Sequence, residues 1–201
     1  MTLYDIKPKF QDLLRPIVKK LYSKGITANQ VTLAALIGSI GIGVLLIIFP
    51  YPHLFIILPI YLFFRMALNA IDGMLAREFY QQSNLGALLN ELGDVLSDLF
   101  LYLPFLFLSQ ASIVFILIAL FLMFLTEFCG VLVQTIGASR RYDGPLGKSD
   151  RALILGTYGL LLAVWPASVQ FLTVIFICIA LLCLYTCFNR CQKGLKQIST
   201  Q

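Results

Sequence analysis

Residues 69–100 gather polar side chains that could bind a metal ion. Asn69 and Asp72 are three residues apart, and Asn90 and Asp94 are four apart, so each pair would share one face of a helix. The short connection between the two helices predicts antiparallel neighbours whose polar faces meet. Carboxylate and amide oxygens suit a hard divalent cation such as Mg²⁺, which can neutralise phosphate oxygens. The spacing therefore predicts a divalent-cation site that faces a phosphorylated substrate.

Two glycines and an arginine accompany these residues. Gly73 and Gly86 would leave space beside the backbone for a phosphate or a flat ring, although small residues also allow membrane helices to pack closely. Arg77 follows the first polar segment, where it either binds a phosphate or marks the end of a membrane span. The residues alone leave both alternatives open.

These side chains must be positioned by helices inside a membrane. The chain has 201 residues, of which 59% are hydrophobic and only 12% are charged, against about 25% charged residues in soluble domains. A transmembrane helix needs about 20 mainly apolar residues. We therefore expect an all-α integral membrane protein with six transmembrane helices. The six stretches are residues 29–49, 54–76, 86–108, 111–136, 152–165 and 169–189.

The basic residues predict how these helices are oriented. Fourteen of the fifteen Lys and Arg residues lie on one side of the six-span topology. The positive-inside rule then places both termini and the polar site at the cytoplasmic face. The net charge of +5 is explained in this way, and a nucleic-acid partner is not expected.

The first residues predict a helix of a different kind. Residues 3–21 place apolar side chains at helical spacing, with Lys and Arg at most other positions. This pattern is typical of an amphipathic helix that lies on the membrane surface, and Pro8 or Pro16 would break it. The expected organisation is an amphipathic segment, a membrane domain and a cytoplasmic tail. Their bounds are 1–26, 27–191 and 192–201.

Three further charged residues lie deep in the expected spans. Arg65, Asp98 and Glu127 are each about twelve residues from the cytoplasmic edge, or about 18 Å along a helix. Each ionised group at that depth costs about 2.5–3.5 kcal/mol unless it has a partner. We expect these residues to form a structural ion-pair layer beneath the site. The alternative is a proton relay in a transporter.

A basic connection precedes the fifth span. A guanidinium group matches the geometry of a phosphate, so this segment is a candidate site for an anionic group. The alternative is that its charges only set the topology. Ser149 or Asp150 is expected to cap the following helix. The basic candidates are Arg140, Arg141, Lys148 and Arg151.

The polar motif resembles a known signature. Asn69-x2-Asp72-Gly73-x2-Ala76-Arg77-x8-Gly86-x3-Asn90-x3-Asp94 resembles D-x2-D-G-x2-A-R-x8-G-x3-D-x3-D, the signature of the CDP-alcohol phosphotransferase family. The chain departs from it at Asn69 and Asn90, where the family has Asp. The six spans, the amphipathic first helix and the basic connection are also similar to the family, and the whole chain is most similar to a branch of small enterobacterial members.

The resemblance implies a reaction, a cofactor and a compartment. A phosphatidyl group would pass from a CDP-linked lipid such as CDP-diacylglycerol to an acceptor hydroxyl, with release of CMP. One or two Mg²⁺ or Mn²⁺ ions would assist at the cytoplasmic face of a bacterial inner membrane. The acceptor is expected to be a small alcohol, such as a phosphorylated polyol held by the basic connection. A homodimer is also a family trait.

The resemblance also implies roles for individual residues. Asp72 and Asp94 would be metal ligands, with Asn69 and Asn90 in the remaining ligand positions. Asp94 would also act as the general base that deprotonates the acceptor. The residues implied in binding CDP are Asp72, Gly73, Ala76, Arg77 and Gly86.

The two asparagines reduce the charge available to hold metal. Only Asp72 and Asp94 remain where the signature has four carboxylates. We therefore expect either that one ion binds weakly without substrate or that one ion suffices. The alternatives to an active transferase are an inactive nucleotide-lipid-binding paralogue and a small membrane transporter.

Overall fold

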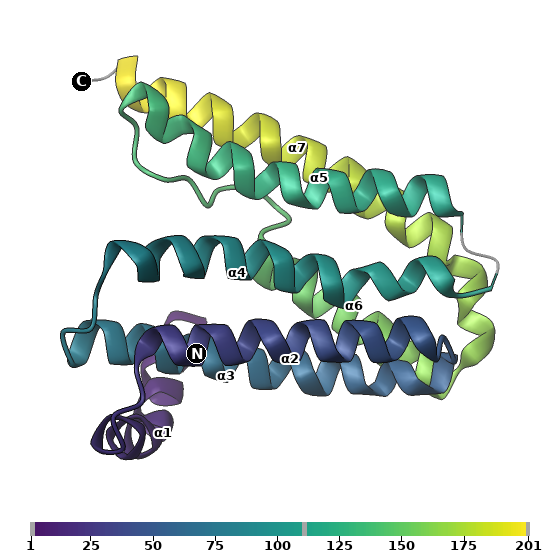
Figure 1. Cartoon of the computed structure of the whole chain (residues 1–201). Coiled ribbons are helices and arrows are strands. Elements are labelled where there is room, and N and C mark those ends of the chain that lie inside the picture. Colours follow the sequence, from purple (N-terminus) through teal and green to yellow (C-terminus); the bar gives the residue numbers. More distant parts are fainter. Residues whose placement is uncertain (1–2, 110–111, 200–201) are drawn as a thin grey trace.

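The computed structural model describes residues 3–109 and 112–199, and side chains from residue 10 onward. In these ranges the chain is helical and contains no strand. Figure 1 shows that the long helices run roughly alongside one another, whereas α1 lies across the ends of α2 and α3. The elements are α1 (Leu3–Ser23), α2 (Ala28–Ile48), η1 (Pro52–Ile56), α3 (Ile57–Glu78), α4 (Asn84–Tyr102), η2 (Leu103–Phe107), α5 (Ile113–Leu132), η3 (Val133–Ile136), α6 (Lys148–Val164), η4 (Pro166–Phe171) and α7 (Leu172–Ser199).

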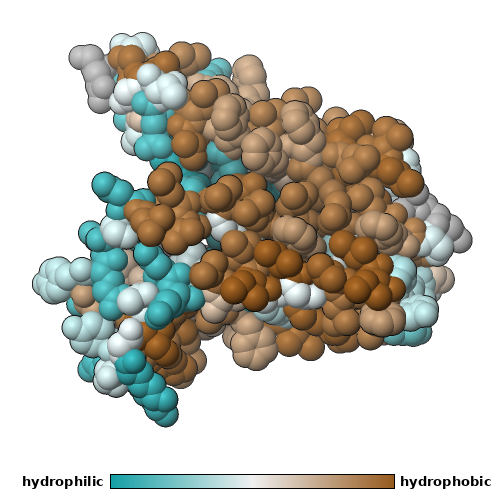
Figure 2. All heavy atoms as spheres, viewed as in Figure 1, coloured by the Kyte–Doolittle hydropathy of each residue, from teal (hydrophilic) through white to brown (hydrophobic). Residues whose placement is uncertain are grey.

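The surface and the helix lengths are those of a membrane protein. Figure 2 shows a broad hydrophobic surface with hydrophilic side chains gathered at the ends of the molecule. In the described ranges, the segments long and apolar enough to cross a membrane are Ala28–Ile48, Pro52–Glu78, Ile113–Ile136 and Pro166–Ser199. Two further long helices, α4 and α6, pack against α2 and α3, respectively. The helix α4 is less apolar than these segments because it carries three carboxylates, and α6 is shorter, with 17 residues.

Helix ends follow local chemistry more closely than hydropathy. Thr27 and Gln30 form the capping box that starts α2. The span expected at 86–108 begins earlier, at Asn84, and turns into η2 at Leu103, next to a proline that lacks an amide donor. The expected start of the fourth span at residue 111 lies outside the described residues. The last helix continues past residue 189 to Ser199.

The polar faces of α3 and α4 meet, as expected, because Arg65 of α3 pairs with Asp94 and Asp98 of α4 and Asn69 donates to Asp94. Both α3 and α4 pack mainly against α2. Gly43 of α2 lies against the backbone carbonyl of Phe100, and Gly38 lies against the ring of Tyr61, so added Cβ atoms would clash there. Small residues of this kind allow membrane helices to approach closely. The close backbone packing in this part of the bundle is therefore that of α2 against α3 and α4.

The helix α1 is continuous, so the expected break at Pro16 is wrong. Leu14 and Val18 are buried in a cluster with residues of α2 and α3. Leu13 remains 72% exposed and Ile17 48% exposed. One apolar stripe thus anchors α1 to the bundle, and a second stripe faces outward.

The main apolar core lies away from the polar motif. Its centre is built from aromatic residues, with Phe105 packed against Phe55, Tyr158 and Phe176 at ring-centroid distances of 4.9, 6.0 and 5.5 Å. This core joins η1, η2, α6 and α7 at one end of the bundle. The opposite ends of the helices are left to hold the charged residues.

Candidate active site and its ion-pair network

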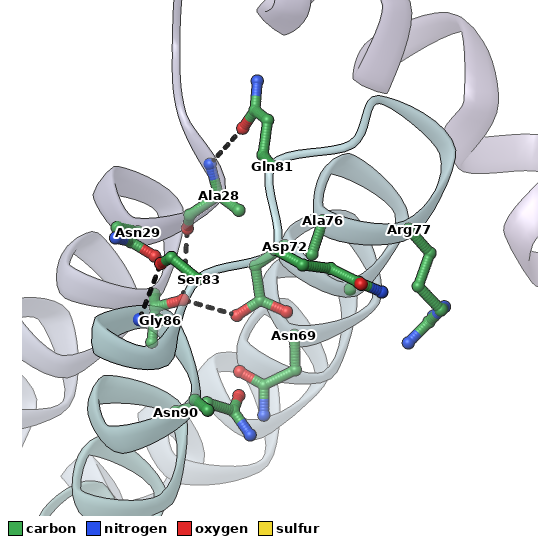
Figure 3. A pocket seen from close by; sticks show the side chains of 14 residues that line it. Ala28, Asn29, Asn69, Asp72, Ala76, Arg77, Gln81, Ser83, Gly86 and Asn90 are labelled. Atoms are coloured by element: carbon green, nitrogen blue, oxygen red, sulfur yellow. Dashed lines mark hydrogen bonds between the residues drawn. The ribbon is translucent and has the colours of Figure 1, made fainter.

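A cavity of about 410 Å³ lies between α2, α3 and α4. Figure 3 shows the side chains of Asn69, Asp72 and Asn90 gathered in it. The cavity brings together all predicted motif residues except Asp94. The lining residues are Ala28, Asn29, Thr32, Asn69, Asp72, Gly73, Ala76, Arg77, Gln81, Gln82, Ser83, Gly86, Ala87 and Asn90.

Asp72 is held in place by α2. Its residue is only 6% exposed, and its Oδ2 accepts a hydrogen bond of 2.9 Å from the hydroxyl of Thr32. The same hydroxyl also lies 3.1 Å from the carbonyl of Ala28, so its one proton is shared between the two acceptors. The motif gave no indication of Thr32, because it lies 40 residues earlier on a helix with little other polar character.

The two motif glycines serve different purposes. A Cβ at Gly86 would lie 2.7 Å from Oδ1 of Asn29 and 3.0 Å from the hydroxyl of Ser83, so this glycine allows α4 to approach α2. A Cβ at Gly73 would lie 3.0 Å from the guanidinium of Arg77. Gly73 therefore keeps the cavity open beside a cationic group, which is consistent with binding a phosphate.

Asp94 faces away from this cavity and toward α3 and α6. Arg65 Nη2 lies 3.4 Å from its Oδ1, Asn69 Nδ2 donates to the same oxygen at 3.3 Å, and the ammonium of Lys148 also contacts it. Asn69 lines the first cavity and also a second one, of about 450 Å³, between α3 and α6. Asn69 thus connects Asp94 to the cavity that contains Asp72.

The predicted ion-pair layer is confirmed and is larger than expected. Arg65 pairs with Asp98 at 2.5 Å, and Arg151 pairs with Asp98 at 3.1 Å and with Glu127 at 3.0 Å. Arg190 lies 3.4 Å from Glu127. Arg151 and Arg190, which were counted among the basic residues flanking the spans, are each 1% exposed inside the bundle.

The basic candidates do not gather around one free anion site. Arg140 pairs with Glu91 and Glu127, and its guanidinium lies 4.5 Å over the ring of Tyr142. Arg141 bonds Asp143 at 2.7 Å. Lys148 and Arg151 pair with carboxylates as described above. Glu91 and Glu127 were not recognised from the sequence as partners for this segment.

Local hydrogen bonds hold the start of α6 and the connection before it. The N-cap of α6 is Gly147, so the helix begins before the two predicted caps. Asp150, the third helical residue, accepts a hydrogen bond of 2.9 Å from the amide of Gly147 through its Oδ2, as the third residue of a capping box does. Asp143 lies in the connection outside the helices. Partial burial alone would raise the pKa of Asp143, but hydrogen bonds from Lys193 and Arg141 hold it below its usual value.

The oxygen donors of the site are of the kind that a hard divalent ion prefers. Asp72, Asn69 and Asn90 line one cavity and offer carboxylate and amide oxygens. In the described part of the chain, no three His, Cys, Asp or Glu side chains are grouped as a metal site. Any ion held here would need further oxygens from a substrate or from water.

Known proteins share this sequence and architecture. The family model for CDP-alcohol phosphatidyltransferase matches residues 25–187. The chain is 54% identical over 195 residues to the inner membrane protein YnbA of Escherichia coli strain K12, with 97% of each chain covered. It superposes on the phosphatidylinositol phosphate synthase PgsA1 of Mycobacterium tuberculosis with CDP-DAG bound, with a TM-score of 0.72 and 21% identity over 89% of this chain and 92% of that one. PgsA1 in complex with manganese and citrate gives a TM-score of 0.72 and 21% identity over 90% and 88%.

Proposed function

This chain belongs to the CDP-alcohol phosphatidyltransferase family, and we propose that it transfers a phosphatidyl group from a CDP-linked lipid to an acceptor hydroxyl with release of CMP. The observation that carries this proposal is the cavity between α2, α3 and α4. Seven motif residues line it, although they come from two different helices, α3 and α4. The presence of CDP-DAG in the related PgsA1 structure supports CDP-diacylglycerol as the donor.

The cavity suits the cytidine diphosphate part of such a lipid. Its polar walls come from the amides of Asn29, Asn69 and Asn90 and from the connection after α3. The guanidinium of Arg77 beside Gly73 would bind a phosphate of the pyrophosphate. The acyl chains would remain in the bilayer beside the apolar surface of α2 and α3.

A divalent ion, Mg²⁺ or Mn²⁺, would be held by Asp72 with help from the amide oxygens of Asn69 and Asn90. When bound, such an ion neutralises pyrophosphate oxygens and stabilises the charge that develops on CMP as it leaves. The PgsA1 structure with manganese supports this assignment. The hydroxyl of Thr32 would hold the Asp72 carboxylate in place through Oδ2.

Asp94 would act as the general base. All three of its described side-chain contacts reach Oδ1, so Oδ2 is available to accept the proton of the acceptor hydroxyl. The acceptor oxygen then attacks the phosphorus that bears the lipid, and the bond from that phosphorus to the oxygen of CMP breaks. The products are a new phospholipid and CMP.

The acceptor would be a small alcohol, and a phosphorylated polyol fits the basic connection best. The side chains of Arg140 and Arg141 are 19% and 23% exposed, so an incoming phosphate could exchange with their carboxylate partners. Lys148 borders the cavity between α3 and α6. Arg151 would not contact the acceptor and would instead hold Asp98 and Glu127 in place through its two ion pairs.

The membrane placement completes the proposal. The relative YnbA is described as an inner membrane protein, and we place this chain in a bacterial inner membrane with six spans. The domain would comprise residues 27–191, with α1 at the cytoplasmic surface and both termini and the site on the same side. The outward stripe of Leu13 and Ile17 supports contact between α1 and the lipid interface.

One alternative follows from a specific observation. Asn69 and Asn90 are neutral, and Asp94 contacts both Lys148 and Arg65. These features would also be found in a paralogue that binds a nucleotide-lipid without turning it over. An assay of lipid products separates the two possibilities.

Lipid mass spectrometry of membranes from cells with and without the overproduced chain is the test of the proposed function. We expect a phospholipid class that rises with the active chain and does not rise with Asp72→Asn. The variant Glu78→Gln is the matched control, since Glu78 pairs with Arg15 away from the cavity. Unchanged lipid composition with the wild-type chain, although CDP-diacylglycerol binds, would support the inactive paralogue.

A further inference from the structure

Lys148, the first residue of α6, is directed at a carboxylate of the proposed site. Its ammonium contacts Oδ1 of Asp94, and the two side chains are 29% and 26% exposed. Arg65 and Asn69 reach the same oxygen, at 3.4 and 3.3 Å. Two cations and an amide thus already compensate this oxygen without a metal ion.

The carboxylates near the cavity are too few for two divalent ions. Asp72 and Asp94 carry one negative charge each, and the ammonium of Lys148 brings these three groups to a net formal charge of −1. Arg65 is left out of this count because its shorter ion pair is with Asp98. Asn69 and Asn90 add no charge. Asn69, which lines the cavity, donates to the same oxygen of Asp94 that Lys148 contacts, so the ammonium lies close to the cavity wall. A second divalent ion near Asp94 would have to lie close to this ammonium, and like charges repel strongly at short distance.

We propose that Lys148 is a resident cation, so that the site holds a single divalent ion near Asp72 and uses the ammonium where a second ion would otherwise be required. This inference rests on the proposed function, because it concerns how the site balances the pyrophosphate of a CDP-lipid. Lys148 is a positioning residue that fixes Asp94 through Oδ1 and leaves Oδ2 for the acceptor proton.

The number of Mn²⁺ ions bound per chain tests this proposal. Free Mn²⁺ can be titrated by electron paramagnetic resonance in the presence of the purified full-length chain and in the absence of lipid substrate. We expect one ion in the wild type and one in Asn69→Asp/Asn90→Asp, which should bind that ion at least tenfold more tightly. Adding Lys148→Met to the double variant should raise the number to two.

Two controls separate the charge of Lys148 from its bulk and from general effects. Lys148→Arg keeps the cation and should keep a single ion in the double-aspartate background. Lys193→Met removes a lysine that pairs with Asp143 outside the cavity, and it should also leave one ion. If the triple variant does not fold, Lys148→Met alone in the wild-type background should still tighten Mn²⁺ binding at least tenfold.

Specific results would overturn the proposal. These are two Mn²⁺ ions in the wild type, two in the double-aspartate variant with Lys148 intact, or unchanged Mn²⁺ binding after Lys148→Met. CMP release is measured separately. A chain that binds one ion and releases no CMP would overturn the proposed function and leave the assignment of Lys148 standing.

Discussion

The guanidinium of Arg151 lies at the centre of the charges buried in this protein. It donates to Asp98 at 3.1 Å and to Glu127 at 3.0 Å. Arg65 pairs with the other oxygen of Asp98, and Arg190 pairs with the other oxygen of Glu127. Pairing of Arg65, Asp98 and Glu127 could be predicted, because unpaired charges are expensive in a membrane. The roles of Arg151 and Arg190 could not, because both occur near expected span ends, where basic residues are ordinary.

Replacing Arg151 should therefore destabilise the protein. Arg151→Met leaves Asp98 and Glu127 with fewer partners in a buried site, and we expect a loss of about 3 kcal/mol. Thermal unfolding in detergent would record this as a clearly lower melting temperature. Arg15→Met removes exposed ion pairs with Asp12 and Glu78 and should change the melting temperature little. Equal melting of Arg151→Met and the wild type would contradict the role assigned to this network.

Among the helices, α2 determines the shape of the site. Hydropathy located a helix at each of the six expected stretches, and four of these segments in the described residues are long and apolar enough to cross a membrane. The close packing of α2 against both α3 and α4 could not be predicted, since α2 is apolar nearly all round and its glycines do not reveal which neighbour they face. Asn29 and Thr32 of α2 line the cavity, and Gly43 allows α2 to pack closely against α4.

Two glycines of α2 offer a matched test of this packing. Gly43→Ala places a methyl group against the backbone of Phe100, and we expect it to cost about 1–3 kcal/mol through overpacking. Gly41 has nothing within 4 Å of an added Cβ, so Gly41→Ala should be neutral or stabilising by up to about 1 kcal/mol, because alanine favours helix. Melting temperatures in detergent would show the difference, and equal shifts for the two variants would count against the arrangement of α2 and α4.

At the scale of the whole molecule, the protein separates an apolar core from a charged half. The aromatic core around Phe105 stabilises one end of the bundle, and the cavities and ion pairs occupy the other. The signature located the candidate cavity in advance, since its residues converge there. It did not reveal that Asp94 faces α6, because its partner Lys148 is the first residue of α6, which is distant in the sequence.

The most direct test of this account is release of CMP from CDP-diacylglycerol by the purified chain in lipid nanodiscs, with Mg²⁺ or Mn²⁺ and candidate acceptor alcohols. We expect release by the wild type and by the control Glu78→Gln. In Asp94→Asn the rate should fall by about 10²–10⁴-fold, because the base is lost while the cavity is retained. Release of CMP by Asp94→Asn at the wild-type rate would contradict the proposed role of Asp94, and absence of release from the wild type with every acceptor would contradict the proposed transferase.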